Sequence, residues 1–300
     1  MRAYSVDAMI AACIDIGSNT TRLLVAEPVD GRLRELLRQR AFTRIGRGRR
    51  TDEEIPEKKI REVADVVATQ VRLARELGTR AIRTVATAAI REAANREDFA
   101  RTLAARAGVE VEVLSGEEEA RLAFVGATNA LEHPPSGDIA VIDVGGSSSE
   151  IAIGTIAGGV RASSSFRIGS GVLADAYLRS DPPSAAQLER VRAHIAGTFE
   201  GFALPTPELA VGVGGSSTSL WRLVGGVLDH ATLQRGLAIL ARTPSEEVAR
   251  TFELEAQRVR LLPGGMLVLQ AISDRLGRPL LIGNGGLREG VILEMVNGAG

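Results

Sequence analysis

The sequence contains a single cysteine, Cys13, among its 300 residues. A lone cysteine excludes an intrachain disulfide and any zinc site built on cysteines. The three histidines are scattered and match no metal-ligand spacing. We therefore expect a reduced protein whose stability comes from its packed core rather than from disulfides or structural zinc.

Long apolar runs and an excess of one charge are also missing. No stretch approaches the roughly 20 apolar residues of a membrane span, and the brief apolar stretch near the N-terminus makes a poor signal peptide. Acidic (37) and basic (36) residues nearly cancel, which excludes the broad basic field typical of nucleic-acid-binding proteins. The best local patch for a polyanion is the basic loop Arg44–Arg50. The sequence predicts a soluble, cytoplasmic protein without membrane or nucleic-acid partners.

Aromatic residues are scarce, at 3% of the chain, whereas hydrophobic residues as a whole reach 45%. The cores must therefore be aliphatic, and the lone tryptophan, Trp221, is expected in one of them. Glycine is abundant, at 33 residues, which indicates many tight turns or close backbone approaches. The length suits two domains of about 150 residues each.

The most informative feature is an internal repeat at an offset of 128 residues. Residues 12–27 read ACIDIGSNTTRLLVAE, and residues 140–155 read AVIDVGGSSSEIAIGT. Asp15 aligns with Asp143 and Gly17 with Gly145. Each copy is an apolar run ending in Asp, a Gly/Ser turn and a second apolar run, followed by another turn and a third extended segment. This pattern predicts two similar domains, each opening with a β-meander.

Helical patterns separate the remaining strands in both halves. Pro56–Leu77 carries an apolar stripe at helical spacing, and residues 81–86, 109–114, 209–213 and 279–283 read as strands. The alternation predicts α/β domains with mixed sheets around an inter-domain cleft. The clearest break, HPPSGD at 133–138, suggests domains 1–128 and 129–300, leaving open whether the last helix packs back on the first domain.

Two repeated loops, residues 15–20 and 143–149, have the composition of phosphate-binding loops. Glycine allows backbone N–H groups to approach a phosphate, and Ser, Thr and Asn add polar groups beside them. Asp15 and Asp143, one at each strand end, suit a hydrated Mg²⁺ ion. Either loop alone reads equally as an ordinary hairpin turn, because the same residues are common turn formers. Two matching copies favour the phosphate-binding interpretation, since a duplicated pair can face each other across a cleft.

A third glycine-rich stretch contains Gly214 and Gly215. It follows a predicted strand and opens a predicted helix, which suits anion binding at the helix start. It lacks both the dinucleotide-binding spacing and the P-loop lysine.

The acidic run 117–119 begins the helix that leads toward the break. Negative charge at a helix N-terminus is favourable by itself, which is one explanation of the run. The alternative is that one glutamate acts as a general base on a water molecule. Glu150, directly after the second loop, is a further carboxylate for a metal or water.

Two arginines are candidates for clamping phosphate oxygens. Arg22 follows the first loop, and Arg91 lies in the segment AAIRE. A surface ion pair is the alternative for each. A serine-hydrolase triad is not supported, because the histidines are sparse and no Gly-x-Ser-x-Gly turn follows a strand.

Four segments together resemble the exopolyphosphatase/guanosine pentaphosphate phosphohydrolase (Ppx/GppA) family. They read DIGSNT from Asp15, SGEEEAR from Ser115, IDVGGSSSE from Ile142 and GLREG from Gly286. The resemblance runs from about residue 10 to 297 and fits the short, two-domain form. It implies two ribonuclease H-like domains of the actin/hexokinase/heat-shock ATPase superfamily.

The resemblance also implies roles for individual residues. The family's catalytic glutamate, just before Ala-Arg, corresponds to Glu119. Its acids for metal and water correspond to Asp143 and Glu150, and its first-loop acid to Asp15. Arg22 and Arg91 match substrate-contact positions. The phosphate-binding positions are Gly17, Ser18, Asn19, Thr20, Gly145, Gly146, Ser147 and Ser148, and we add Gly214 and Gly215 as substrate-binding candidates.

The function implied is Mg²⁺-dependent exopolyphosphatase activity, which releases the terminal phosphate of polyphosphate, in a homodimer. Hydrolysis of guanosine pentaphosphate (pppGpp) is the close alternative, and an ATPase or kinase of the same superfamily is a weaker one. The second loop has Ser147 where the family commonly has glycine, and Val172 stands in a segment that has lost the family's arginine. These departures motivate an alternative of another class, a non-catalytic alarmone or polyphosphate sensor.

Overall fold

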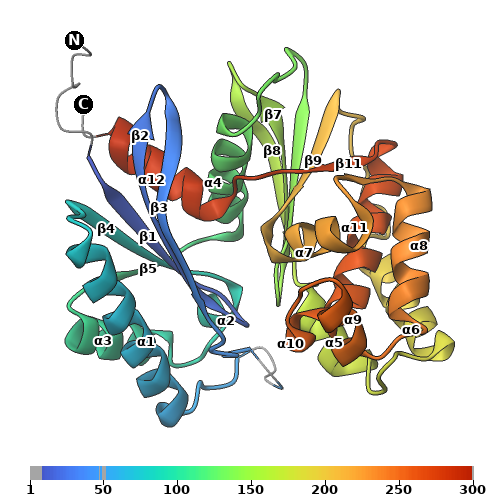
Figure 1. Ribbon diagram of the computed structural model, residues 1–300, viewed down its shortest axis with the longest axis horizontal. Coiled ribbons are helices and arrows are strands. Elements are labelled where there is room, and N and C mark those ends of the chain that lie inside the picture. The colour runs from blue at the N-terminus through green and yellow to red at the C-terminus, as the bar shows by residue number, and fades with distance from the viewer. Residues whose placement is uncertain (1–8, 47, 49–51, 299–300) are drawn as a thin grey trace. The chain divides into compact units, whose positions relative to one another are not determined.

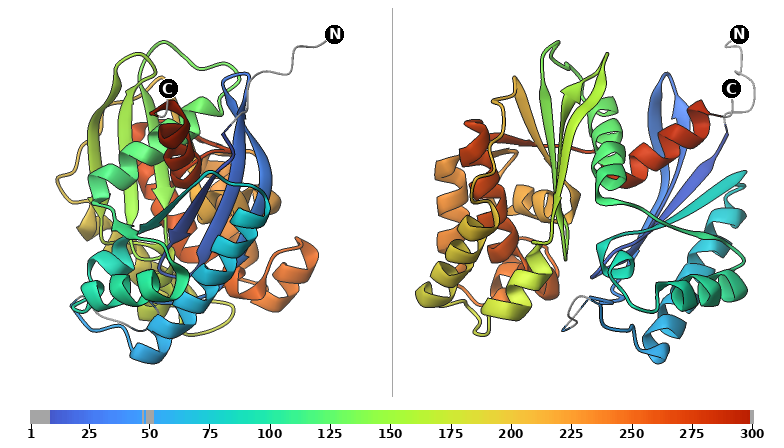
Figure 2. Two further views of the ribbon diagram at one scale, coloured as in Figure 1. Left: turned by 90° about the vertical axis from the view of Figure 1, so that its left-hand side faces the viewer. Right: turned by 180° about the vertical axis from the view of Figure 1, so that it is seen from behind.

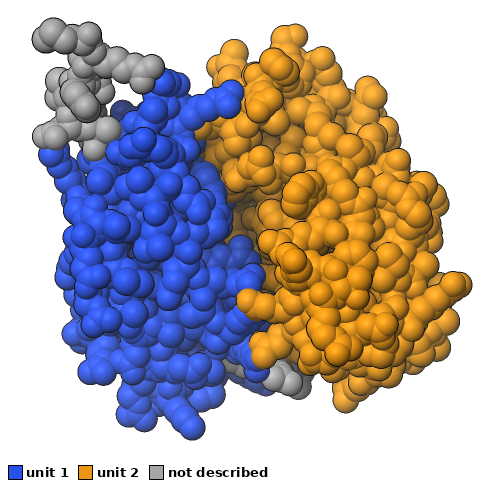
Figure 3. Space-filling model, viewed as in Figure 1, with its two compact units in different colours: residues 1–45, 49–115, 287–300 blue, residues 46–48, 116–286 orange. Residues whose placement is uncertain are grey.

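The computed structural model describes residues 9–46, 48 and 52–298. The chain divides into two compact units, coloured separately in Figure 3. Unit 1 comprises the described residues of 1–45, 49–115 and 287–300, and unit 2 those of 46–48 and 116–286. Each unit is an α/β domain built on a mixed sheet, as the sequence predicts (Figure 1).

The sheet of unit 1 has the strand order β3-β2-β1-β4-β5. Its strands are β1 (Ala11–Ile16), β2 (Thr21–Val29), β3 (Arg32–Ala41), β4 (Ala81–Ala86) and β5 (Val111–Val113). The first three form the predicted antiparallel meander, and β4 and β5 continue the sheet in parallel with β1. The loop 15–20 therefore lies at the carboxyl end of β1.

Helices cover both faces of this sheet (Figure 2). The helix expected over Pro56–Leu77 is present as α1 (Glu57–Glu76), and it packs with α3 (Arg96–Ala107) over a core that is aliphatic except for Phe99. The short helix α2 (Ala88–Arg91) follows β4. The last helix, α12 (Leu287–Asn297), packs against β1, β2 and β4.

The sheet of unit 2 repeats this arrangement and adds one edge strand. Its order is β8-β7-β6-β9-β11-β10. The strands are β6 (Ile139–Val144), β7 (Ser149–Thr155), β8 (Gly159–Phe166), β9 (Leu209–Val213), β10 (Val227–Leu228) and β11 (Leu280–Ile282). Strands β6–β8 form the second meander, and β9 and β11 are parallel to β6, as β4 and β5 are to β1. The duplication inferred from the sequence is thus a duplication of topology.

The two faces of the unit 2 sheet carry different helices. The helix α4 (Gly116–Asn129) packs on β6, β7 and β8. The larger core on the other face includes residues of α5, α6, α7, α8, α9 and α11. These helices are α5 (Ser170–Tyr177), α6 (Ala185–Thr198), α7 (Gly214–Val224), α8 (His230–Leu240), α9 (Ser245–Thr251) and α11 (Leu262–Leu276), with the short α10 (Ala256–Val259) between the last two.

Two placements differ from what the sequence suggests. The break between the units falls after Ser115, so α4 belongs to unit 2, because its apolar side packs on the second sheet. Trp221 was expected in a core, but it is 57% exposed, because it lies on the outward side of α7 while Leu220 and Leu223 point inward.

The structure also bears on the expected absence of membrane spans and on the basic loop. Within the described residues, no helix combines the length and hydropathy needed to cross a membrane. In the basic loop, Arg47, Arg49 and Arg50 lie outside the described residues.

Candidate active site

The two repeated loops close with the same hydrogen bond. The Gly17 N–H donates to the Thr20 carbonyl at 3.0 Å, and the Gly145 N–H donates to the Ser148 carbonyl at 2.9 Å. A Cβ atom at Gly17 or Gly145 would lie 3.3 or 3.1 Å from the same carbonyl oxygen. Both turns are therefore tight enough to favour glycine at their first position, which explains its recurrence at the offset of 128.

In unit 2 a second segment supports the loop from behind. The Ser170 N–H donates to the Gly145 carbonyl at 2.9 Å, and the Gly171 N–H donates to the Gly146 carbonyl at 2.8 Å. A Cβ atom at Gly169 would lie 2.5 Å from the Gly146 carbonyl and 2.7 Å from the Ser147 nitrogen. The loop conformation therefore depends on close backbone contact with the start of α5.

Two predicted carboxylates are cross-strand neighbours. Asp143 on β6 is registered opposite Glu150 on β7, and Glu150 opposite Ser165 on β8. Residues directly opposite each other share a face of the sheet. The face is the one covered by α4, because Val141 and Ala152, two residues away along the same strands, pack in the α4 core. Ser165 Oγ donates to Glu150 Oε1 at 2.9 Å, and Glu150 is only 2% exposed.

The predicted catalytic glutamate lies on the helix that covers this face. Glu119 is 8% exposed, whereas Glu117 is exposed and Glu118 forms an ion pair with Arg121 at 2.7 Å. The first residue of α4, Gly116, touches β8 so closely that a Cβ atom there would lie 2.4 Å from Ser165 Cβ. Positions three apart share a helix face. Gly116 and Glu119 therefore both face the sheet.

The third glycine-rich stretch, at the start of α7, also lies beside Asp143. Gly214 has a φ of +76°, and a Cβ atom on it would lie 2.0 Å from Asp143 Oδ1, so only glycine fits. Ser216, in the first turn of α7, donates from Oγ to the Val144 carbonyl at 3.0 Å. Gly214 and Gly215 thus begin a helix whose N-terminus adjoins the second loop and its aspartate.

Unit 1 carries the opposite charge at the equivalent position. Asp15 is registered opposite Arg22, just as Asp143 is opposite Glu150. Arg22 Nε donates to Thr20 Oγ1 at 3.0 Å, which ties the arginine to the first loop. Burial raises the pKa of Asp15, while the positive charges of Arg22 and Arg288 act to lower it. The first loop therefore has an aspartate opposite an arginine, whereas the second has an aspartate opposite a glutamate.

The other predicted arginine, Arg91, is engaged with the backbone of unit 1. Its Nη1 donates to the Leu114 carbonyl at 2.7 Å. Leu114 in turn donates its N–H to the Ala86 carbonyl. Arg91 therefore helps to fix the end of the segment that leads out of β5, two residues before α4 begins.

Asp143 and Glu150 offer the ligand chemistry that Mg²⁺ prefers. Magnesium is usually bound through one or two carboxylates, with waters and substrate phosphates completing its coordination. The described part of the chain holds no convergent set of three or more His, Cys, Asp or Glu residues arranged for a metal ion. The residues therefore fit a hydrated ion held by two carboxylates, and they do not fit a metal enclosed by protein ligands.

Three positions shape the site by contacts that the sequence does not predict. Gly116 and Ser165 dock α4 on the sheet, and Gly169 packs against the second loop. Gly116 and Gly169 lie in segments quoted from the sequence, but their packing partners are distant in the chain and so cannot be read from it.

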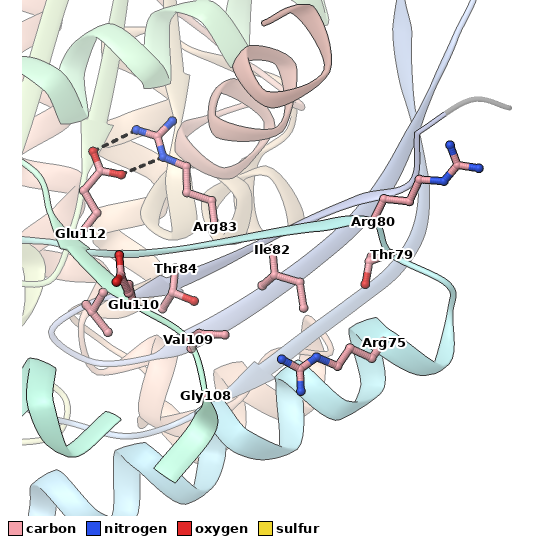
Figure 4. A pocket seen from close by; sticks show the side chains of 11 residues that line it. Arg75, Thr79, Arg80, Ile82, Arg83, Thr84, Gly108, Val109, Glu110 and Glu112 are labelled. Carbon is pink, nitrogen blue, oxygen red and sulfur yellow. Dashed lines mark hydrogen bonds and ion pairs between the residues drawn. The ribbon is translucent and has the colours of Figure 1, made fainter. Parts of the chain in front are cut away.

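A separate pocket lies at the other end of the unit 1 sheet (Figure 4). It has a volume of about 740 Å³ and includes the amino end of β4, whereas Asp15 lies near the carboxyl end of β1, parallel to it. Arg83 within it is paired with Glu112, at 2.8 and 2.9 Å, and with Glu294 at 3.1 Å. None of the predicted site residues is among the lining residues Arg75, Thr79, Arg80, Ile82, Arg83, Thr84, Gly108, Val109, Glu110, Val111 and Glu112.

Comparison with curated proteins identifies relatives along nearly the whole chain. The guanosine-5'-triphosphate,3'-diphosphate pyrophosphatases of Vibrio atlanticus and Photobacterium profundum are 25% and 26% identical to it, over 98% and 95% of its residues. The chain spans only 61% and 59% of the length of these two proteins.

Solved structures give the same result for the fold. The Ppx/GppA family member of Aquifex aeolicus superposes with a TM-score of 0.82 at 29% identity, covering 98% of this chain and 99% of its own. An exopolyphosphatase from Cytophaga hutchinsonii has a TM-score of 0.86 at 20% identity, covering 97% and 98%, and so shares the fold. The duplicated meander is the predicted actin-like architecture. The model of the Ppx/GppA phosphatase family matches residues 24–299, and the chain belongs to that family.

Proposed function

We propose that the protein hydrolyses terminal phosphoanhydride bonds, with the reaction carried out on the α4 face of unit 2. The observation that carries this proposal is the Asp143–Glu150 pair at the end of the second loop. Buried Glu119 faces the same sheet, on the helix anchored by Gly116. Water attack on a phosphoryl group needs positioning and a proton acceptor, and carboxylates beside a phosphate-binding loop can supply both.

In the proposed reaction, Glu119 orients a water molecule and accepts its proton. The water oxygen forms a bond to the terminal phosphorus, and the bond from that phosphorus to the bridging oxygen breaks, with its electrons leaving on the shortened chain. Backbone N–H groups and hydroxyls at Gly145–Ser148 bind the phosphate oxygens. Gly214 and Gly215 add the helix start of α7.

We propose Mg²⁺ as the cofactor, with Asp143 and Glu150 holding it. The ion, when bound, neutralises charge on the phosphate oxygens. Asp15 is a further proposed ligand, and the positive charges of Arg22 and Arg288 also act on its carboxyl group. The first loop, Gly17–Thr20, with Arg22 is proposed to bind phosphate groups. A homodimer in the cytoplasm remains part of this proposal.

Inorganic polyphosphate is the substrate we propose first. The guanosine-5'-triphosphate,3'-diphosphate pyrophosphatases among the relatives support pppGpp as the alternative. Two residues still favour the sensor hypothesis. Ser147 replaces the family's glycine in the second loop, and Val172, whose N–H donates to the Gly146 carbonyl, lies in the segment that has lost the family's arginine. Turnover separates the sensor from both enzymes.

The decisive experiment is phosphate release from polyphosphate and from pppGpp, with Mg²⁺ and with a chelator. Glu119→Gln keeps the shape of the side chain and removes the proton acceptor, so kcat should fall by about 10²- to 10⁴-fold. Glu117→Gln, on the exposed side of the same helix, is the matched control and should retain the native rate. Equal rates for native protein and Glu119→Gln would remove Glu119 from the mechanism, and binding without any turnover would favour the sensor.

A further inference from the structure

Helix α7 presents one exposed stripe that begins at the candidate site. Gly214 adjoins Asp143, and Thr218 and Trp221 are exposed, whereas Leu220 is buried. At 3.6 residues per turn, positions 214, 218 and 221 lie on the same side of the helix. Thr218 Oγ1 donates to the Gly214 carbonyl at 2.9 Å, which is the contact expected one turn apart. The stripe therefore runs from the phosphate-binding end of α7 to the indole of Trp221.

The indole is accessible at the far end of this stripe. Trp221 is 57% exposed, and the chain next to it turns through Gly225 and Gly226, which have no side chains to cover it. A Cβ atom at Gly226 would lie 3.4 Å from the indole nitrogen, at ordinary contact distance, so Gly226 adjoins the edge of the ring. The adjacent Arg222 is turned away, because its Nη1 donates to the Glu253 carbonyl at 2.7 Å.

The separation matches a ligand with phosphates at one end and an aromatic base at the other. Seven residues of helix span about 10 Å. That length is appropriate for a ribose with its phosphate chain. Stacking on an aromatic side chain binds a base without requiring particular hydrogen bonds. A bare polyphosphate has no group that benefits from an indole.

We propose that Trp221 is the base-binding residue of the site for a nucleoside polyphosphate, the alternative substrate of the proposed function, and that inorganic polyphosphate binds without this contact. The inference rests on the proposed function, because it takes the phosphates to bind at Gly145–Ser148 and at the start of α7. It assigns the nucleoside end of such a substrate to an exposed aromatic side chain of unit 2.

The fluorescence of the protein reports on this contact directly, since Trp221 is the only tryptophan. The Glu119→Gln variant is titrated with pppGpp and with inorganic tripolyphosphate, and free tryptophan in the same solutions corrects for absorption by the nucleotide. Quenching by pppGpp alone is expected. Binding of pppGpp in calorimetry with no change in fluorescence would overturn the proposal, as would binding of tripolyphosphate but not pppGpp.

Kinetics of the active protein supply the second readout. Trp221→Ala should raise KM for pppGpp by about 5- to 100-fold, the equivalent of one base stack, and leave KM for polyphosphate unchanged. Trp221→Phe should recover part of the loss. Ile156→Ala is the matched control, because Ile156 is 50% exposed beyond the end of β7 opposite Glu150.

The outcomes separate this inference from the proposed function. An equal loss on both substrates in Trp221→Ala would refute base recognition and leave the hydrolase standing. Nucleotide-specific quenching in a native protein that hydrolyses neither substrate would support Trp221 while the hydrolase fails.

Discussion

The position of Glu119 depends on the close contact between Gly116 and Ser165, and replacing Gly116 with alanine tests that dependence. The new Cβ atom would lie 2.4 Å from Ser165 Cβ and 2.7 Å from Ser165 Oγ, whereas ordinary contacts begin at 3.4 Å. The start of α4 or the Ser165 strand must therefore move by about 1 Å. Overpacking of this kind typically costs about 1–3 kcal/mol of stability.

The same movement should reduce catalysis. A shift of ~1 Å in a catalytic group is associated with losses of about 10²-fold in rate. Moving Ser165 also endangers its 2.9 Å hydrogen bond to Glu150. We expect Gly116→Ala to lower both the free energy of unfolding, measured in urea, and kcat for phosphate release.

A double-mutant cycle and a matched control make this prediction specific. Ser165→Gly removes both atoms that the new methyl group would meet, so Gly116→Ala should be less damaging in that background. Gly197→Ala, in α6 of the same unit, meets nothing within 4 Å and should stabilise the helix by about 0.5–1 kcal/mol. The reasoning is refuted if Gly116→Ala behaves like Gly197→Ala, or if its effects and those of Ser165→Gly are simply additive.

Two other predictions concern the two loops. Gly169→Ala should distort the second loop, because its methyl group would lie 2.5 Å from the Gly146 carbonyl. Steady-state kinetics should then show a higher KM for the phosphate substrate. An unchanged KM would mean that the loop adapts without cost. Asp15→Asn should stabilise the protein at neutral pH. The pKa of Asp15 is raised in the folded state, whereas in the unfolded state it is about 3.9. Between these two pKa values only the folded state keeps the proton, so the free energy of unfolding falls as pH rises. Denaturation between acidic and neutral pH should therefore show the advantage of Asp15→Asn growing with pH, and an advantage that shrinks would contradict this assignment.

Much of the fold is visible in the sequence because local patterns encode it. Helical spacing identifies α1, apolar and alternating segments identify β4, β5 and β9, and the repeat at 128 residues predicts the duplicated meander. The Asp-Gly loops follow from turn chemistry, which requires glycine at residues 17 and 145. The short elements β10 and α10 were missed, because two or four residues contain too little periodicity to recognise.

What the tertiary structure alone decides is which distant residues meet. The strand register sets Glu150 opposite Asp143 but Arg22 opposite Asp15, so the pair is doubly acidic in unit 2 and of mixed charge in unit 1. The contact of Gly116 with Ser165 and the exposure of Trp221 cannot be predicted from the neighbouring sequence, because each depends on packing with distant parts of the chain. Sequence periodicity specifies elements and their inward faces, whereas the chemistry of a site depends on the long-range packing that brings those elements together.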